Sequence, residues 1–173
     1  MITVDEVREA YHYDPETGEF TWKIRSAKRI KIGDKAASER SQTKRNQGYL
    51  CTSYKGKSYT LHRLAWFYVY GEWPDLIDHI DRDKHNNRIS NLRKATYSEN
   101  AMNSGVYKSN TSGHRGVTLQ KQKGKTPLWL AKITVNGKQL YLGCSKDKSK
   151  AISLRQEAEK KFFPALQRDL VGQ

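Results

Sequence analysis

Cysteine is scarce in this chain of 173 residues, which contains only Cys51 and Cys144. Two cysteines this far apart in the sequence exclude both a disulfide framework and a four-cysteine zinc ribbon. Long apolar runs are missing too: the mean hydropathy is −0.89, and no run approaches the ~18 residues of a transmembrane helix. Residues 1–10 lack the apolar stretch of a secretory signal. The sequence therefore predicts a soluble, intracellular protein.

Acidic residues are few compared with basic ones. The chain has 32 Lys and Arg against 18 Asp and Glu, a net charge of +14 and a pI near 9.8, so a polyanionic partner is the first physical explanation. Residues 101–173 carry fourteen of the basic and only four of the acidic side chains. We therefore expect the C-terminal part to be the stronger electrostatic anchor. No basic amphipathic helix with an inserting face of Trp and Leu accompanies this charge, so a membrane surface is not the predicted partner.

Local patterns predict helices and hairpins in the first 71 residues. Thr3 and Glu6 form a capping box that opens a short helix, and Gly71 ends a helix whose apolar residues recur at helical spacing. Residues 23–45 carry nine Lys and Arg and two acids. This run is interpreted as a solvated loop, or as a phosphate-tracking arm if the rest of the chain binds nucleic acid. The predicted elements are a helix to about Tyr11, a turn at 14–18, a strand at 19–23, a hairpin over 49–61 and a helix at 61–70.

Two polar side chains interrupt a short apolar strand predicted at 76–80. Asp78 and His79 occupy its middle, and buried strands do not normally carry an acid and an imidazole side by side. A polar loop follows at 81–87, then a second strand at 92–95 and a capping box of Thr96 with Glu99. The order is strand, loop, strand, helix, and the helix carries Asn100.

These polar residues suit the hydrolysis of a phosphodiester. The reaction needs a base for water, a positive charge near the phosphoryl oxygens and rigid positioning of both. The imidazole of His79 supplies the base, and the Asp78 carboxylate with an amide oxygen can hold a hard divalent metal. Asn91 can hydrogen-bond the loop backbone and fix the conformation of His79.

The pattern of residues 59–104 resembles the HNH endonucleases, whose ββα-metal fold has the same order of elements. The resemblance implies that His79 is the general base, Asn91 the middle asparagine, and Asn100 the third member, which is often histidine. It also implies that Asp78 and Asn100 are ligands of one divalent metal, Mg²⁺ or Mn²⁺ rather than zinc because the third histidine is absent. The residues that carry the resemblance are Leu61–Trp66, Asp78-His79, Asn86–Leu92 and Thr96–Asn100.

Other interpretations of these residues are a calcium loop and a purely structural polar loop. The alternation of Asp81, Asp83 and His85 is typical of a calcium loop, but Asn86 and Leu92 stand where that loop needs Gly and Glu. A polar loop before a capped helix would explain the same residues without any chemistry. At the start of the 61–70 helix, His62 and Arg63 are interpreted as structural residues, with contact to the DNA backbone as the alternative.

The last block predicts a three-stranded antiparallel sheet covered on one side by a helix. Strands are expected at 116–120, 129–135 and 139–142, with an Asn136-Gly137 hairpin turn between the last two. A helix from about Ser149 stops at Pro164. Period-two alternation places Trp129, Ala131, Ile133 and Val135 inward, and Lys132 and Thr134 outward beside Gln120 and Tyr141.

This block is similar to the APETALA-type domain of ethylene-response factors, in which such a sheet lies in the major groove of DNA. The resemblance rests on Arg115–Val117, Trp129–Ile133, Asn136–Lys138 and Tyr141–Gly143. It implies that Arg115, Gln120, Lys132, Thr134 and Tyr141 face the groove, although the chain has fewer arginines there than the plant domains. Charge alone predicts phosphate contacts for Lys121, Lys123, Lys125 and Lys138.

We therefore predict an α+β protein: a ββα-metal HNH nuclease module followed by a three-stranded antiparallel sheet packed on one helix. The predicted parts are an N-terminal segment with the basic arm at 1–58, the nuclease module at 59–104 and a DNA-binding domain at 113–164. By resemblance the protein is a phage or homing-type endonuclease in the cytoplasm of a bacterial or phage-infected cell. It would hydrolyse double-stranded DNA to 5′-phosphate and 3′-hydroxyl ends, as a monomer rather than a dimer. The alternatives are a non-catalytic DNA-binding regulator and a nuclease for junctions or RNA.

Overall fold

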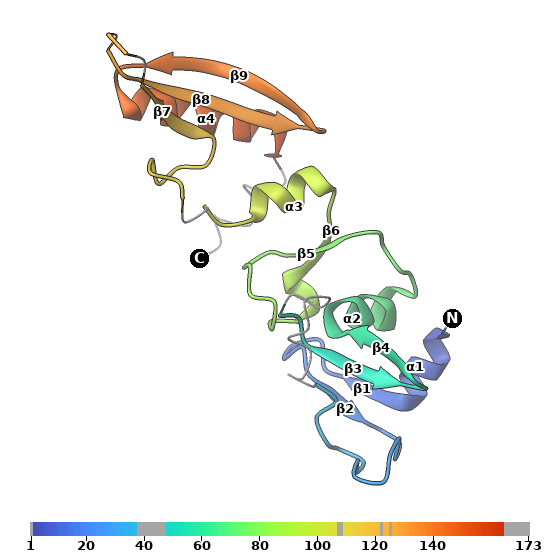
Figure 1. Ribbon diagram of the computed structural model, residues 1–173. Helices are drawn as coiled ribbons and strands as arrows, with labels where there is room; N and C mark the ends of the chain where they lie inside the picture. The colour runs from blue at the N-terminus through green and yellow to red at the C-terminus, as the bar shows by residue number, and fades with distance from the viewer. Residues whose placement is uncertain (1, 38–47, 107–108, 122, 125, 165–173) are drawn as a thin grey trace. The chain divides into compact units, whose positions relative to one another are not determined.

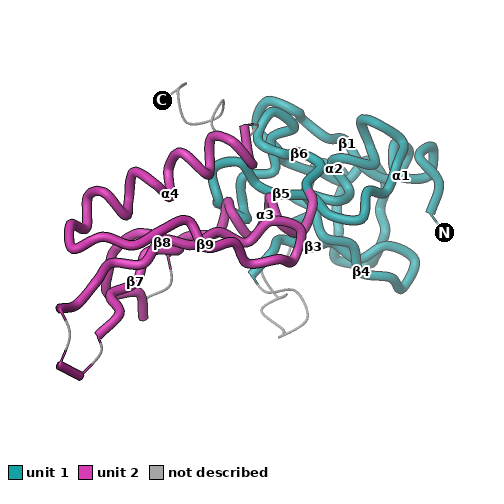
Figure 2. Tube along the Cα trace, turned by 90° about the horizontal axis from the view of Figure 1, so that it is seen from above, with its two compact units in different colours: residues 1–95 teal, residues 96–173 magenta. Residues whose placement is uncertain are grey.

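The computed structural model describes residues 2–37, 48–106, 109–121, 123–124 and 126–164 (Figure 1). The chain divides into two compact units, residues 1–95 and 96–173 (Figure 2). Within the described ranges there are four α-helices, three two-stranded antiparallel sheets and one three-stranded antiparallel sheet. The predicted α+β class is confirmed. The division after residue 95 falls inside the predicted 59–104 module, and the predicted module boundaries stay predictions.

The first unit begins with two elements that local sequence patterns specify. Helix α1 (Val4–Ala10) starts at the capping box of Thr3 and Glu6, in which each side chain bonds the backbone N–H of the other residue. Strand β1 (Tyr11–Tyr13) follows at once and pairs with β2 (Phe20–Trp22). Residues 14–19 form the turn between these two strands.

A second hairpin and a helix complete this half of the unit. Strand β3 (Cys51–Tyr54) pairs with β4 (Lys57–Thr60), and α2 (Leu61–Tyr70) ends at Gly71, whose φ of 72° needs glycine. The helix predicted at 61–70 therefore agrees with the structure at both ends. The basic arm predicted at 23–45 is described only as far as residue 37, and its remainder lies outside the described residues.

Strands β5 (Ile77–His79) and β6 (Leu92–Lys94) form a short antiparallel pair. Asp78 lies opposite Arg93, and His79 lies opposite Leu92. The connection between them ends in a single 3-10 turn, η2 (Ile89–Asn91). Strand β5 stops at His79, so this imidazole stands where the chain leaves the sheet and enters the polar loop.

One hydrophobic core joins the N-terminal elements to α2 and to the β5–β6 pair. It combines aromatic residues of the first hairpin with aliphatic residues of the helix and of both short strands, so the first 22 residues are part of the same core as the polar loop's strands. Its buried members are Val7, Ala10, Tyr11, Tyr13, Phe20, Trp22, Ala36, Leu61, Leu64, Ala65, Trp66, Phe67, Ile77 and Leu92.

The second unit holds the helix after β6 and the predicted C-terminal sheet. Helix α3 (Tyr97–Asn103) begins at the capping box of Thr96 and Glu99. Strands β7 (Val117–Gln120), β8 (Leu128–Val135) and β9 (Lys138–Ser145) follow in the order β7-β8-β9. Helix α4 (Lys148–Phe162) covers one face of this sheet (Figure 1), as the sequence predicts.

Alternation along β8 separates a buried face from an exposed one. Ala131 and Ile133 are buried against Ala151 and Ala158 of α4, which confirms the predicted inward residues at the centre of the strand. The guanidinium of Arg155, also buried, donates to the Lys132 carbonyl at 2.6 Å, to Glu159 at 2.7 Å and to the Met102 sulfur at 3.0 Å. Arg155 therefore ties α4 to β8 and to α3.

The two cysteines differ in exposure. Cys51 is buried in the first unit, whereas Cys144 is exposed on β9, opposite Leu130 of β8. No helix within the described ranges is both long enough and apolar enough to span a membrane.

Candidate active site

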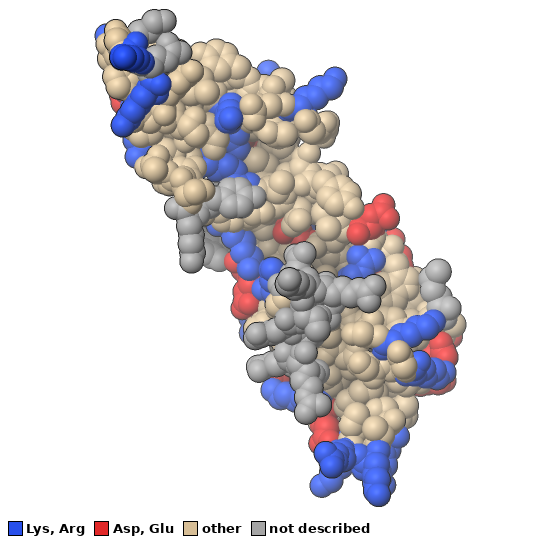
Figure 3. All heavy atoms as spheres, viewed as in Figure 1, with Lys and Arg blue, Asp and Glu red and all other residues tan. Residues whose placement is uncertain are grey.

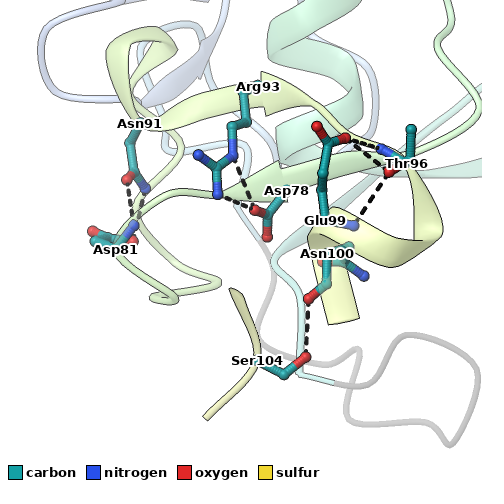
Figure 4. Close-up of polar contacts among 8 residues, drawn as sticks. All are labelled: Asp78, Asp81, Asn91, Arg93, Thr96, Glu99, Asn100 and Ser104. Atoms are coloured by element: carbon teal, nitrogen blue, oxygen red, sulfur yellow. Dashed lines mark hydrogen bonds and ion pairs between the residues drawn. The ribbon is translucent and has the colours of Figure 1, made fainter. Parts of the chain in front are cut away.

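Asp78 is a buried carboxylate with a cationic neighbour on the adjacent strand. The residue is 6% exposed, and its Oδ2 accepts from Arg93 Nη2 at 2.8 Å and from Arg93 Nε at 3.1 Å (Figure 4). The register explains this pair, because Asp78 and Arg93 lie opposite each other and side chains opposite in an antiparallel pair share a face. The ion pair compensates the cost of burying the carboxylate.

His79 lies in an aromatic environment on the other side of the strand. Its ring is 5.8 Å from that of Tyr49 and 5.1 Å from that of His62, centroid to centroid. Burial lowers the pKa of His79, and the hydrogen bond to Asn87 and the charges of Asp81, Asp78 and Asp83 oppose that shift in part. The imidazole is therefore neutral at neutral pH, the form that can accept a proton.

His62 is the second buried imidazole of the unit. It is 7% exposed, which rules out contact with a DNA backbone from this conformation and confirms the structural interpretation. Burial, with the positive charges of His79 and Arg63, lowers its pKa to about 3. Its Nδ1 has no hydrogen-bond partner among the residues that the structure describes.

Asn87 is the residue whose carboxamide reaches His79, and the sequence analysis did not single it out. Its Oδ1 lies 3.3 Å from His79 Nε2, and its Nδ2 donates to the His85 carbonyl at 3.2 Å. Only 1% of Asn87 is exposed. In the sequence Asn87 is one of several asparagines in a polar loop, and nothing local distinguishes it from its neighbours.

Asn91 holds the loop closed rather than pointing at the imidazole. Its Nδ2 donates to Asp81 Oδ1 at 2.9 Å and to the Asn86 carbonyl at 2.8 Å, while its Oδ1 accepts from the Asp81 backbone N–H at 3.0 Å (Figure 4). The Asn91 carbonyl also accepts from Ile80 N at 2.9 Å. These bonds join the two ends of the loop, so the predicted bonding of Asn91 to the loop backbone is present, and its orientation of His79 stays a prediction.

Asn100 lies in the first turns of α3, in the second unit. Its backbone N–H donates to the Thr96 carbonyl at 3.0 Å, and its own carbonyl accepts from Ser104 N at 3.1 Å and Ser104 Oγ at 3.0 Å. The capping box of Thr96 and Glu99 fixes where this helix begins and hence which turn carries Asn100 (Figure 4). Asp78 belongs to the first unit, so a metal site that uses both residues stays a proposal.

The donor chemistry of this region fits a hard divalent cation. A carboxylate from Asp78 and an amide oxygen from Asn100 are the kinds of ligand that Mg²⁺ and Mn²⁺ prefer. Among the residues that the structure describes, no three His, Cys, Asp or Glu side chains gather as a metal cage. A metal held by two protein oxygens would keep most of its coordination for water and phosphate, as magnesium sites in phosphoryl chemistry do.

Residues 59–102 match the HNH endonuclease family. The match runs from the end of β4 through α2, the β5–β6 pair and most of α3, and it includes Asp78, His79, Asn91 and Asn100. The matched part amounts to about a quarter of the sequence.

A phage protein is also similar to this chain. Protein 3.8 of Escherichia phage T7 is 38% identical over 80 residues, which cover 45% of this chain and 64% of that protein. The chain therefore matches a little under two thirds of its relative's length. No solved structure matches the chain.

Four of the C-terminal residues predicted to contact DNA lie on one sheet face. The register pairs Lys132 with Tyr141, and Thr134 and Gln120 have the same parity, so all four point away from α4. Arg115 differs, because its Nη2 donates to the Ser104 and Gly105 carbonyls at 2.5 and 2.8 Å. Lys121, Lys123 and Lys138 are exposed, and Lys125 lies outside the described residues. The HNH match ends at residue 102, so the APETALA-type resemblance is a prediction.

Exposed basic residues also gather on the loop after β2. Figure 3 shows Lys and Arg side chains at the end of the first unit, and the residues are Arg25, Lys28, Arg29, Lys31 and Lys35, all exposed. Asp34 is the single acid between residues 23 and 37. This described part of the arm has the charge that a phosphate backbone would bind.

Proposed function

We propose that this protein is a metal-dependent DNA endonuclease of the HNH type that hydrolyses one phosphodiester at a time. The observation that carries the proposal is the HNH match over residues 59–102 together with the position of His79. His79 is buried at the end of β5, directly after Asp78 in the sequence, and a carboxamide reaches its Nε2. A held, neutral imidazole is what a general base requires.

The reaction follows from this arrangement. Water attacks the phosphorus, a new P–O bond forms, and the bond between phosphorus and the 3′ oxygen breaks. His79 takes a proton from the attacking water, and the leaving 3′ oxygen ends as a hydroxyl after gaining a proton from solvent. The products are a 5′-phosphate and a 3′-hydroxyl, and Asn91 keeps the loop closed through its bonds to Asp81 and Asn86.

Asp78 and Asn100 are the proposed ligands of one Mg²⁺ or Mn²⁺ ion. When bound, such an ion stabilises negative charge on the phosphoryl and leaving oxygens. The ion pair with Arg93 holds the buried Asp78 side chain in a fixed orientation. The oxygen-only donor set supports a hard cation over zinc.

The second unit is the proposed DNA anchor. The sheet face that points away from α4 carries Gln120, Lys132, Thr134 and Tyr141, and fourteen of the chain's basic residues but only four acids lie beyond residue 100. An APETALA-type contact of this face with the major groove, made by a monomer on double-stranded DNA, is consistent with that charge.

Plasmid nicking across a metal titration tests the division of roles. His79→Ala should slow cleavage by roughly 10² to 10⁴ at every metal concentration, the range for loss of a general base. Asp78→Ala and Asn100→Ala should recover part of their activity as Mg²⁺ or Mn²⁺ is raised, because a weakened metal site fills at higher concentration. Asn91→Ala should give a milder defect with some loss of stability.

His12→Ala is the matched control for the base. His12 is exposed on β1 in the same unit, and its loss should leave nicking unchanged. Wild-type rates in His79→Ala would contradict the nuclease mechanism and leave the non-catalytic DNA-binding protein as the explanation. A chelator that fails to stop the wild-type protein would contradict the metal.

A further inference from the structure

We propose that Asn87 and the β1–β2 hairpin beneath it are the positioning elements for His79. The inference rests on the proposed function, since it assigns residues that hold the proposed base. Asn87 would fix which ring nitrogen of His79 carries the proton, and Tyr13 and Gly18 would fix Asn87. The hairpin residues lie outside the 59–102 range that matches the HNH family.

The hydrogen bonds of Asn87 determine how its carboxamide is oriented. Its Nδ2 donates to the His85 carbonyl at 3.2 Å, and a carbonyl oxygen can only accept, so the nitrogen must face His85. The Oδ1 then faces His79 Nε2 at 3.3 Å. An amide oxygen accepts a hydrogen bond, so Nε2 of the neutral ring carries the proton. Nδ1 is therefore the nitrogen that holds the lone pair for a proton from water.

The backbone of Asn87 is in turn held by the first hairpin. Tyr13 Oη donates to the Asn87 carbonyl at 2.8 Å, and this bond is buried. The Pro15 carbonyl accepts from Ile89 N at 3.3 Å. Both bonds join segments more than 70 positions apart in the sequence, so the loop is docked on the hairpin at Asn87 and two residues after it.

Gly18 shows how closely the hairpin turn approaches the loop. A Cβ at residue 18 would lie 2.5 Å from Arg88 N and 2.5 Å from the Asn87 carbonyl carbon. These are backbone atoms, which cannot rotate away as a side-chain end can. The φ of Gly18 is +75°, which also favours glycine. The turn is therefore pressed against the peptide that follows Asn87.

The main test measures the protonated nitrogen of His79 without requiring activity. In ¹⁵N-labelled full-length protein, the imidazole nitrogen shifts report the fraction of the Nε2–H form. Tyr13→Phe should lower that fraction and reduce kcat about fivefold with KM little changed, because one hydrogen bond to the Asn87 backbone is lost. Tyr11→Phe is the control, since Tyr11 also lies on β1 with a buried hydroxyl, but this one bonds Thr52 at 3.3 Å. It should leave the shifts unchanged.

Two further pairs of variants test Asn87 and Gly18. Asn87→Leu removes the acceptor and should abolish the tautomer preference and slow cleavage ~10 to 100-fold, the range for residues that orient a functional ligand. Asn87→Asp keeps an acceptor for Nε2–H and should keep the preference. Gly18→Ala should disturb the His79 shifts. Gly56→Ala should not, because Gly56 has a similar φ of +73° but nothing within 4 Å of its added Cβ.

The outcomes separate this inference from the proposed function. Equal His79 shifts in Tyr13→Phe, Asn87→Leu and the wild type would overturn the positioning role even if the wild type cleaves DNA. Altered His79 shifts in these variants, together with a wild type that never cleaves DNA, would overturn the proposed function and keep the positioning role. Loss of kcat with unchanged shifts would assign Asn87 a purely structural role and also overturn the inference.

Discussion

His62 places a pH-dependent element inside the first unit. Its imidazole is buried beside Tyr49 and His79, at ring distances of 4.5 and 5.1 Å, and its pKa is lowered to about 3 from an unfolded value near 6.5. The unfolded chain therefore binds a proton between these values that the folded chain does not, and stability falls as pH drops through this window.

We expect His62→Leu to lose less stability in acid than the wild type. Protonation of His62 in the unfolded chain lowers the free energy of unfolding by about 2 to 3 kcal/mol between pH 7 and pH 4.5. Leucine cannot be protonated, so the variant lacks this loss. Urea unfolding of both proteins at the two pH values measures the difference. Equal losses in the two proteins would show that His62 is not held neutral in the fold.

At the level of single residues, the sequence singles out Asp78 and His79 but not the residues that contact them. Asp78 and His79 stand out because an apolar strand rarely carries both. Asn87 did not stand out, because its importance comes from Tyr13 and Gly18, which lie far away in the sequence. Tertiary packing of distant segments leaves no periodic or local mark, so the support of His79 could not be inferred from spacing.

Among the helices, the two capping boxes offer matched tests of local stability and site function. Thr96→Ala and Thr3→Ala each remove the side-chain acceptor for an N3 backbone N–H, from Glu99 and Glu6 respectively. Each should cost about 1 kcal/mol in the free energy of unfolding. Only Thr96→Ala should also raise the Mg²⁺ concentration needed for half-maximal nicking, because α3 carries Asn100, the proposed metal ligand.

Thermal unfolding and metal titrations of the two variants check this expectation. A raised Mg²⁺ requirement in Thr3→Ala, or an unchanged one in a destabilised Thr96→Ala, would contradict the link between the start of α3 and the metal.

Most elements could be predicted because their signals are local. Gly71 after an apolar 3.6-residue pattern bounds α2, and Asn136-Gly137 marks the β8–β9 turn, with φ values of 48° and 77°. Helix α4 begins at Lys148 after an Asp147 cap, one residue before the expected start. The division of the chain after residue 95 could not be predicted from local signals, because it depends on contacts between residues that are far apart in the sequence.

For the whole molecule, the distribution of charge predicts two separable DNA contacts. Two full-length triple variants test this, and each removes three exposed charges from one unit. One changes Lys121, Lys123 and Lys138 to Gln, and the other changes Lys28, Arg29 and Lys31 to Gln. Wild-type affinity should fall roughly 10³ to 10⁵-fold between 50 and 200 mM salt, as for six to ten phosphate contacts. Each variant should flatten the slope of log K against log salt by up to about 2.7.

Fluorescence anisotropy with a labelled duplex measures these slopes. A slope that changes only in the Lys121, Lys123 and Lys138 variant would assign the contact to the second unit alone. A wild-type affinity that hardly depends on salt would contradict backbone contacts altogether.

Cys144 is exposed on the sheet, so its alkylation can report whether DNA covers that face. Its thiol lies opposite Leu130, on the same face of the sheet as Lys132, whereas the other thiol, Cys51, is buried. A maleimide should therefore label the native protein once, and a duplex seated on this face should slow that labelling. The rate of a simple alkylation, followed by mass spectrometry with and without DNA, thus maps the occupied surface without any engineered residue.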